Sequence, residues 1–177
     1  MIITKRQIFV YYALFSVLVC AGLLCGYFIF SDNLNMSVSI QISANFNFLF
    51  TDFCNLIKII LFQFIFGFSI ISTPVCFIIL LNQSLIYGYS IFFIMNSLNR
   101  TDLAIFYIVI YLGILAVYIF ASVKAVLYSK TLVSAVPDFK EIIKLSNTHI
   151  YIKNYIVLSG ILLLLQVIKF GYMILFY

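Results

Sequence analysis

The chain has 177 residues, of which 66% are apolar and 8% are charged, and its formal net charge is +5. Soluble globular domains carry about 25% charged residues, so this composition excludes a soluble protein and indicates an integral membrane protein. Five of the ten basic residues lie between Lys124 and Lys153, which is typical of a cytoplasmic loop beside anionic lipid and argues against nucleic-acid binding. We therefore predict a single domain, an all-α polytopic bundle whose surroundings are the lipid bilayer.

The first predicted span covers residues 8–30 and follows the basic pair Lys5 and Arg6. It is longer than the apolar core of a cleaved signal peptide, so we expect it to remain as a span. Gly22 and Gly26 stand four residues apart, the spacing that lets two helices approach closely. This spacing favours packing within the chain over a seam between two copies in a homo-oligomer.

Residues 31–52 are polar and lack Lys and Arg, which is typical of a loop outside the membrane. Apolar and polar residues alternate from 36 to 48, and this period of two predicts a half-buried strand. Three of the apolar residues are candidates for docking a partner protein: Val38, Ile40 and Ile42. A helical interpretation competes, because a helical stripe leads into the next span and consists of Phe46, Leu49, Phe50 and Phe53.

The central stretch 53–95 is apolar, and as a helix it would reach roughly 65 Å, about twice the hydrocarbon thickness of a bilayer. It must therefore cross the membrane twice. We place the reversal at Ser72, Thr73 and Pro74, where a missing amide hydrogen is tolerated. Four spans follow the first one in this interpretation, at 53–72, 75–95, 103–127 and 155–176.

The connection 128–154 carries four of the ten basic residues. Asp138 and Glu141 have the spacing of a capping box, which predicts a short cytoplasmic amphipathic helix. Its apolar residues Phe139 and Ile142 are further docking candidates. Five spans with the amino terminus inside and the carboxyl terminus outside satisfy the positive-inside rule. We therefore expect a multi-pass protein of a bacterial cytoplasmic membrane.

Polar residues inside predicted spans are costly and are functional candidates by default. They are Asn55, Lys58, Gln63, Asn82, Gln83 and Gln166. We expect Asn82 and Gln83 to hydrogen-bond to another helix, with contact to a substrate or ion as the alternative. Because no carboxylate lies within a predicted span, we expect Lys58 and Lys169 to extend toward the outer headgroups.

Catalytic and metal-binding patterns are missing from the sequence. The only histidine, His149, has no acidic pair or cysteine near it, and the four cysteines lack the spacing of a zinc site. No Walker A loop is present, so ATP would have to act through another chain. We therefore predict a protein that is not an enzyme and holds no cofactor or metal.

A spaced order of Asn and Gly residues covers about half the chain, between residues 46 and 128. It consists of Asn55 at the head of a span, Gly67 in its middle, Asn82 and Gly88 in the next span, and Gly113, Ile114 and Leu115 in the fourth. This order resembles the stage II sporulation protein M family of five-span bacterial membrane proteins. The chain departs from the family pattern at Gln83, Leu112 and Ala116, as a divergent member would.

The resemblance implies a non-enzymatic scaffold that gathers a cell-wall hydrolase complex at the septal membrane during engulfment in sporulation. Its docking surfaces would then be the outer segment 31–51 and the flank of the bundle. Other relatives accompany ABC transporters, so the alternative is a membrane subunit or accessory component of an exporter for a peptide or lipid. In that alternative the helix at 138–144 would face the transporter ATPase, and Asn82 with Gln83 would line a path.

Overall fold

The computed structural model describes residues 5–31, 46–97, 101–135 and 146–176, which form five helices and one short turn. The helices are α1 (Lys5–Ser31), α2 (Phe46–Phe66), α3 (Ser72–Ser97), α4 (Thr101–Ala135) and α5 (Ser146–Phe176). The all-α prediction is confirmed for this part of the chain. Four of the helices, α1, α3, α4 and α5, are long and apolar enough to cross a membrane, which indicates a membrane protein.

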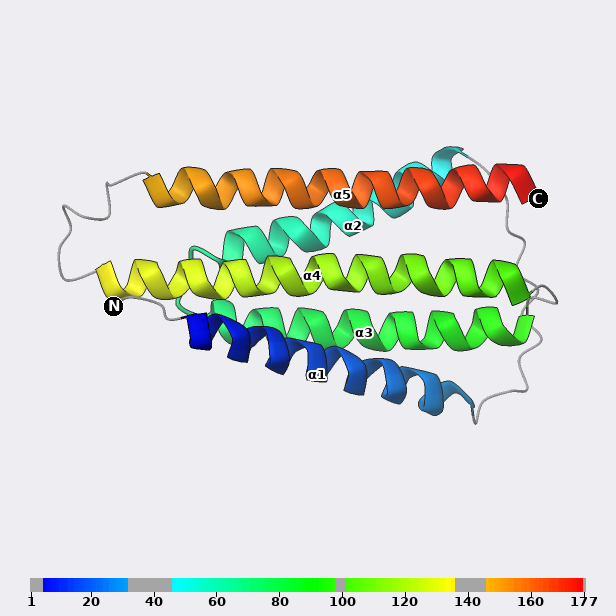
Figure 1. Cartoon of the computed structure of the whole chain (residues 1–177), viewed down its shortest axis with the longest axis horizontal. Coiled ribbons are helices and arrows are strands. Elements are labelled where there is room, and N and C mark those ends of the chain that lie inside the picture. Colours follow the sequence, from blue (N-terminus) through cyan, green and yellow to red (C-terminus); the bar gives the residue numbers. More distant parts are fainter. Residues whose placement is uncertain (1–4, 32–45, 98–100, 136–145, 177) are drawn as a thin grey trace.

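The helices form one elongated bundle in which each helix runs back along the one before it (Figure 1). The start of α1 and the end of α5 therefore lie at opposite ends of the bundle. Helix α4 is central, because it packs against each of the other four. Its Ile114, Tyr118, Ala121 and Val126 are at most 1% exposed. An apolar helix that is buried on most sides supplies the common core on which the other helices pack.

Helices α1 and α3 make a close backbone contact through glycine. A Cβ on Gly26 would overlap the backbone carbonyl oxygen of Leu85, and a Cβ on Gly88 would overlap that of Leu23. Gly22 faces the Ser84 side chain in the same seam. These glycines let the two helices approach more closely than larger residues would allow. Gly22, Gly26 and Gly88 thus lie at a contact within the chain.

The second predicted span, 53–72, is wrong at both ends. Helix α2 begins at Phe46, inside the predicted outer loop 31–52, so the helical interpretation holds from that residue onward. The part of the predicted strand that precedes it, including Val38, Ile40 and Ile42, lies outside the described residues. Hydropathy predicts that the span starts after Asp52. The helix nevertheless includes Asp52, because the carboxylate of this residue is paired within the bundle.

The reversal between α2 and α3 occupies residues 67–71, not 72–74. The chain tightens there into hydrogen bonds three residues apart, such as Phe68 N–H to the Ile65 carbonyl at 3.1 Å. The Ser69 carbonyl accepts a hydrogen bond of 2.5 Å from Ser129 Oγ on α4, which ties the turn to the core. Pro74 stands in the first turn of α3, where its missing N–H needs no partner.

The predicted loop 128–154 is also too long, because α4 continues to Ala135 and α5 begins at Ser146. Tyr128 stacks on Tyr151 with ring centroids 4.1 Å apart, which extends helix packing beyond the predicted spans. With 35 residues, α4 is about 53 Å long and exceeds a hydrocarbon core of ~30 Å. Where α4 ends and α5 begins, these two helices reach beyond the other helices of the bundle (Figure 1). The predicted amphipathic helix with Phe139 and Ile142 lies outside the described residues.

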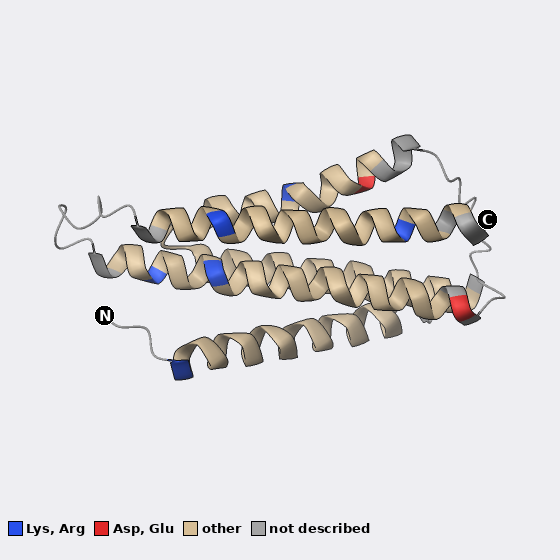
Figure 2. Cartoon of the chain, turned by 45° about the horizontal axis from the view of Figure 1, so that its top comes forward, with Lys and Arg blue, Asp and Glu red and all other residues tan. Residues whose placement is uncertain are grey.

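Charges of the described residues separate along the bundle (Figure 2). Most of the basic side chains gather toward the end where α4 ends and α5 begins, while the acidic side chains lie in the opposite half together with Lys169. The basic group comprises Lys5, Arg6, Lys124, Lys130 and Lys153. The acidic residues are Asp52 in α2 and Asp102 in the first turn of α4. We call the end of the bundle at which α4 ends and α5 begins the basic end.

Candidate functional site

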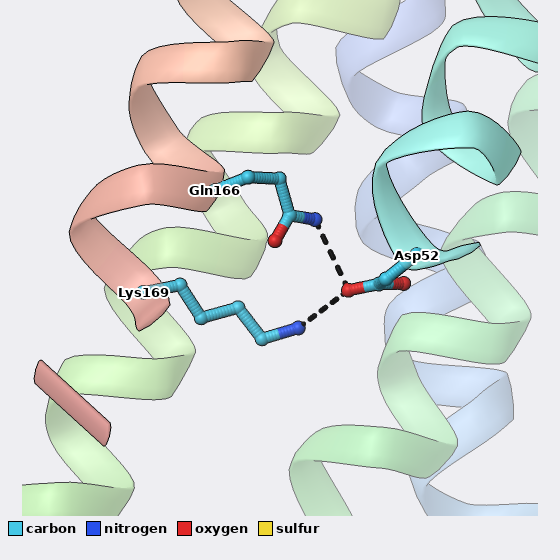
Figure 3. Close-up of polar contacts among 3 residues, drawn as sticks. All are labelled: Asp52, Gln166 and Lys169. Atoms are coloured by element: carbon cyan, nitrogen blue, oxygen red, sulfur yellow. Dashed lines mark hydrogen bonds and ion pairs between the residues drawn. The ribbon is translucent and has the colours of Figure 1, made fainter. Parts of the chain in front are cut away.

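An ion pair between Asp52 and Lys169 joins α2 to α5 (Figure 3). Lys169 Nζ lies 2.8 Å from Asp52 Oδ2. Gln166, one turn earlier on α5, donates from Nε2 to the same oxygen at 3.1 Å. The side chain of Lys169 is 11% exposed and that of Asp52 is 32% exposed. Asp52 therefore accepts two hydrogen bonds from one face of α5, one from the ammonium of Lys169 and one from the amide of Gln166.

Lys169 has a second contact in the same place. Its Nζ lies 5.5 Å from the centroid of the Tyr111 ring on α4, within the range of a cation–π interaction. Tyr111 in turn packs against Tyr87 of α3 at 5.0 Å between ring centroids. The expectation that Lys169 extends freely to the headgroups is corrected by these contacts. A lysine that is this well buried is held by its carboxylate partner.

A second polar contact lies deeper, between α2 and α4. Gln63 is fully buried and donates from Nε2 to Ser122 Oγ at 2.9 Å and to the Tyr118 carbonyl at 3.4 Å. Its Oε1 has no hydrogen-bond partner. The Tyr118 hydroxyl donates back to the Leu56 carbonyl at 3.5 Å. The contact is therefore a set of interhelical hydrogen bonds with one unused acceptor.

Aromatic side chains fill the space around Gly67 toward the basic end. Tyr151 donates from its hydroxyl to the Phe64 carbonyl at 2.9 Å, and its ring stacks on Phe64 at 5.2 Å between centroids. A Cβ on Gly67 would collide with that hydroxyl. Tyr155 donates to the Ala121 carbonyl at 2.7 Å and closes the cluster against α4. Gly67 thus makes room for a tyrosine that joins α5 to α2.

Three polar residues of the predicted spans lie instead on the outer surface. Asn55 and Lys58 of α2 and Asn82 of α3 are exposed, and none has a hydrogen-bond or ion-pair partner among the described residues. Gln83 is half-buried and likewise lacks such a partner. Because α2 starts at Phe46, Lys58 is the thirteenth of its 21 residues and stands near mid-length rather than toward the outer end. The expected hydrogen bonds from Asn82 and Gln83 to another helix are not formed within this part of the chain.

The other predicted site residues are dispersed. Gly113 of α4 faces the Leu165 side chain of α5 at an ordinary packing distance, 3.5 Å from where a Cβ would stand. His149 is exposed near the start of α5. No group of three metal-ligating side chains occurs among the residues that were described. The structure therefore divides the polar residues into two groups. One group forms contacts between α2 and its neighbouring helices, and the other lies on the outer surface of the bundle.

Sequence reasoning missed the ion pair because it assigned Asp52 to a loop. Two signals were available. The helical stripe that begins at Phe46 places Asp52 on a helix, and Gln166 with Lys169 stand three apart on one face of the last span. A carboxylate and a lysine on the same predicted side of the membrane are expected to pair when their helices pack. Nothing in the sequence pointed to Tyr151 as the residue that fills the space over Gly67.

The chain has no match among family models, curated proteins or solved structures.

Proposed function

We propose that this chain is a non-enzymatic membrane scaffold that holds partner proteins against its lateral surface, as the stage II sporulation protein M family does. One observation carries the proposal. The interior polar groups, such as Asp52 and Gln63, bond to neighbouring helices of the same chain. Three polar side chains without any described partner, Asn55, Lys58 and Asn82, lie on the surface that would face lipid. Unpaired amides in a lipid environment are stabilised when another helix supplies their hydrogen bonds.

Five crossings are part of the proposal. Helix α2 has 21 residues and is about 31 Å long, which matches the hydrocarbon thickness of a bilayer. With α2 crossing between the four longer helices, the proposal puts the chain ends on opposite sides of the membrane. The basic end, which includes Lys5, Lys130 and Lys153, then faces the cytoplasm as the positive-inside rule requires. The membrane would be a bacterial cytoplasmic membrane with the carboxyl terminus outside.

The scaffold role is tested by co-purification from the native host. The full-length tagged chain is extracted in mild detergent, and the recovered proteins are quantified by mass spectrometry for the wild type and for Asn82→Leu. We expect a defined set of membrane or wall-associated proteins to decrease in the Asn82→Leu sample. The matched control is Ile156→Leu, which changes an equally lateral position of α5 (67% exposed) without removing a polar group.

The identity of the recovered proteins separates the two partner classes. Recovery of cell-wall hydrolase components supports the scaffold at the septal membrane. Stoichiometric recovery of an ATPase subunit supports the exporter alternative. Recovery of no stoichiometric partner, for the wild type and both variants, contradicts the proposed function.

A further inference from the structure

The outward face of α2 carries one continuous stripe. Its exposed members recur at intervals of three and four residues and therefore lie above one another on one face: Thr51, Asn55, Lys58, Phe62 and Ile65. The opposite face of α2 packs against the bundle through residues that include Leu56, Ile60 and Gln63. The first three members of the stripe are polar, and the last two are apolar. We call these five residues the α2 stripe.

Lys58 is the unusual member of the α2 stripe. It is exposed and stands eight residues from the end of α2 at Phe66, or about 12 Å along the helix. Lys169 of α5 is paired with Asp52, whereas Lys58 has no carboxylate partner among the described residues. Asn55, one turn away, also lacks a hydrogen-bond partner there. The stripe thus presents a cation and an adjacent amide to whatever covers it.

We infer that the α2 stripe docks a transmembrane helix of a different protein, and that this helix carries a Glu or Asp side chain at the depth of Lys58. The inference rests on the proposed scaffold role and names the chemistry of its partner. The carboxylate pairs with Lys58, while Asn55 donates to or accepts from a polar group one turn further along. Phe62 and Ile65 supply the apolar remainder of the contact.

Charge complementarity selects this occupant. A second copy of the chain, docked through the same face about a two-fold axis, would bring Lys58 against Lys58. The described carboxylates of a second copy do not supply a partner for Lys58 either. Asp52 is paired with Lys169, and Asp102 stands on another helix, in the first turn of α4. Lipid hydrocarbon cannot neutralise an ammonium at this depth. A carboxylate on a foreign helix satisfies Lys58 without breaking a contact of this chain.

The test uses model transmembrane helices as probes. Three synthetic Leu/Ala helices that differ only in a central Glu, Gln or Leu are labelled with an acceptor dye. Each is reconstituted in phosphatidylcholine vesicles with the donor-labelled full-length chain, and association is measured by energy transfer. We expect the Glu helix to associate about tenfold more strongly than the Leu helix. Lys58→Met should remove this preference, and Lys58→Arg should retain it.

Lys130→Met is the matched control, since it removes a lysine at the exposed basic end and should leave the Glu preference unchanged. Equal association of the Glu and Leu helices, or a Glu preference that survives Lys58→Met, would overturn the inference and leave Lys58 as a residue that reaches toward the headgroups. The proposed function is scored separately, by the effect of Asn82→Leu on native co-purification. Loss of partners there, with no Glu preference here, would reject the α2 stripe alone.

Discussion

Lys169 on α5 donates a charge-assisted hydrogen bond of 2.8 Å to Asp52 on α2. The two residues are separated by most of the chain, and their contact holds the start of α2 against the last part of α5. It also explains why α2 begins before Asp52 rather than after it, because the carboxylate is neutralised within the bundle. We expect this pair to contribute to the stability of the contact between α2 and α5.

Replacement of one partner of the pair should destabilise the bundle. Lys169→Met leaves Asp52 about two-thirds buried and without its cation, and we expect a loss of about 1–3 kcal/mol. The measurement is the melting temperature of the detergent-solubilised protein by fluorescence-detected size exclusion. The charge-reversed double variant, Asp52→Lys with Lys169→Asp, should recover most of the loss. Additive losses in the double variant would show that the ion pair is energetically unimportant.

Gly67→Ala should destabilise the contact between α2 and α5. The added methyl would meet the hydroxyl of Tyr151, which is 3% exposed, hydrogen-bonded to Phe64 and stacked on Tyr128, and so has little room to move. We expect a loss of about 1–3 kcal/mol in the same melting assay. Gly113→Ala is the matched control, because its methyl would make an ordinary contact with Leu165. Equal melting of the two variants contradicts the proposed packing.

Gly26→Ala and Gly88→Ala should each separate α1 from α3. In both cases the obstacle is a backbone carbonyl oxygen, of Leu85 or Leu23, which cannot rotate away as a side chain can. We expect each variant to lose about 2 kcal/mol or more in melting experiments. Gly160→Ala has nothing within 4 Å of the added methyl and should be neutral or stabilising by up to ~1 kcal/mol. A neutral Gly26→Ala would exclude the close seam.

Hydropathy and charge predicted an all-α fold and a first helix, and the described residues confirm both, because a long apolar run in a membrane has only the helix available to it. The helix ends could not be predicted in the same way. Hydropathy ends the predicted spans before the charges of Lys130 and Lys153. The helices nevertheless include these residues, because α4 continues to Ala135 and α5 already begins at Ser146. Helix continuation depends on packing such as that of Tyr128 on Tyr151.

The polar contacts were predictable in part. Gln63 and Gln166 were expected to be important as amides in apolar spans, and the structure places both in hydrogen bonds between helices. Their hydrogen-bond partners depend on which helix faces meet across the bundle, and this cannot be predicted from a single sequence. Asn82 shows the converse, because an amide in a span was expected to bond inward and instead lies on the outer surface. Its rotational position was set by the seam between α1 and α3.

The crossing of α2 is tested most directly by the accessibility of the segments that precede and follow it. Single cysteines are introduced as Ser39→Cys and Ile70→Cys in a chain whose Cys20, Cys25, Cys54 and Cys76 have been replaced by alanine. Intact cells are then treated with a membrane-impermeant maleimide. Five crossings predict that position 39 is labelled from outside and that position 70 reacts only after permeabilisation. Labelling of both positions from the same side would contradict the crossing of α2, and with it the orientation of the basic end.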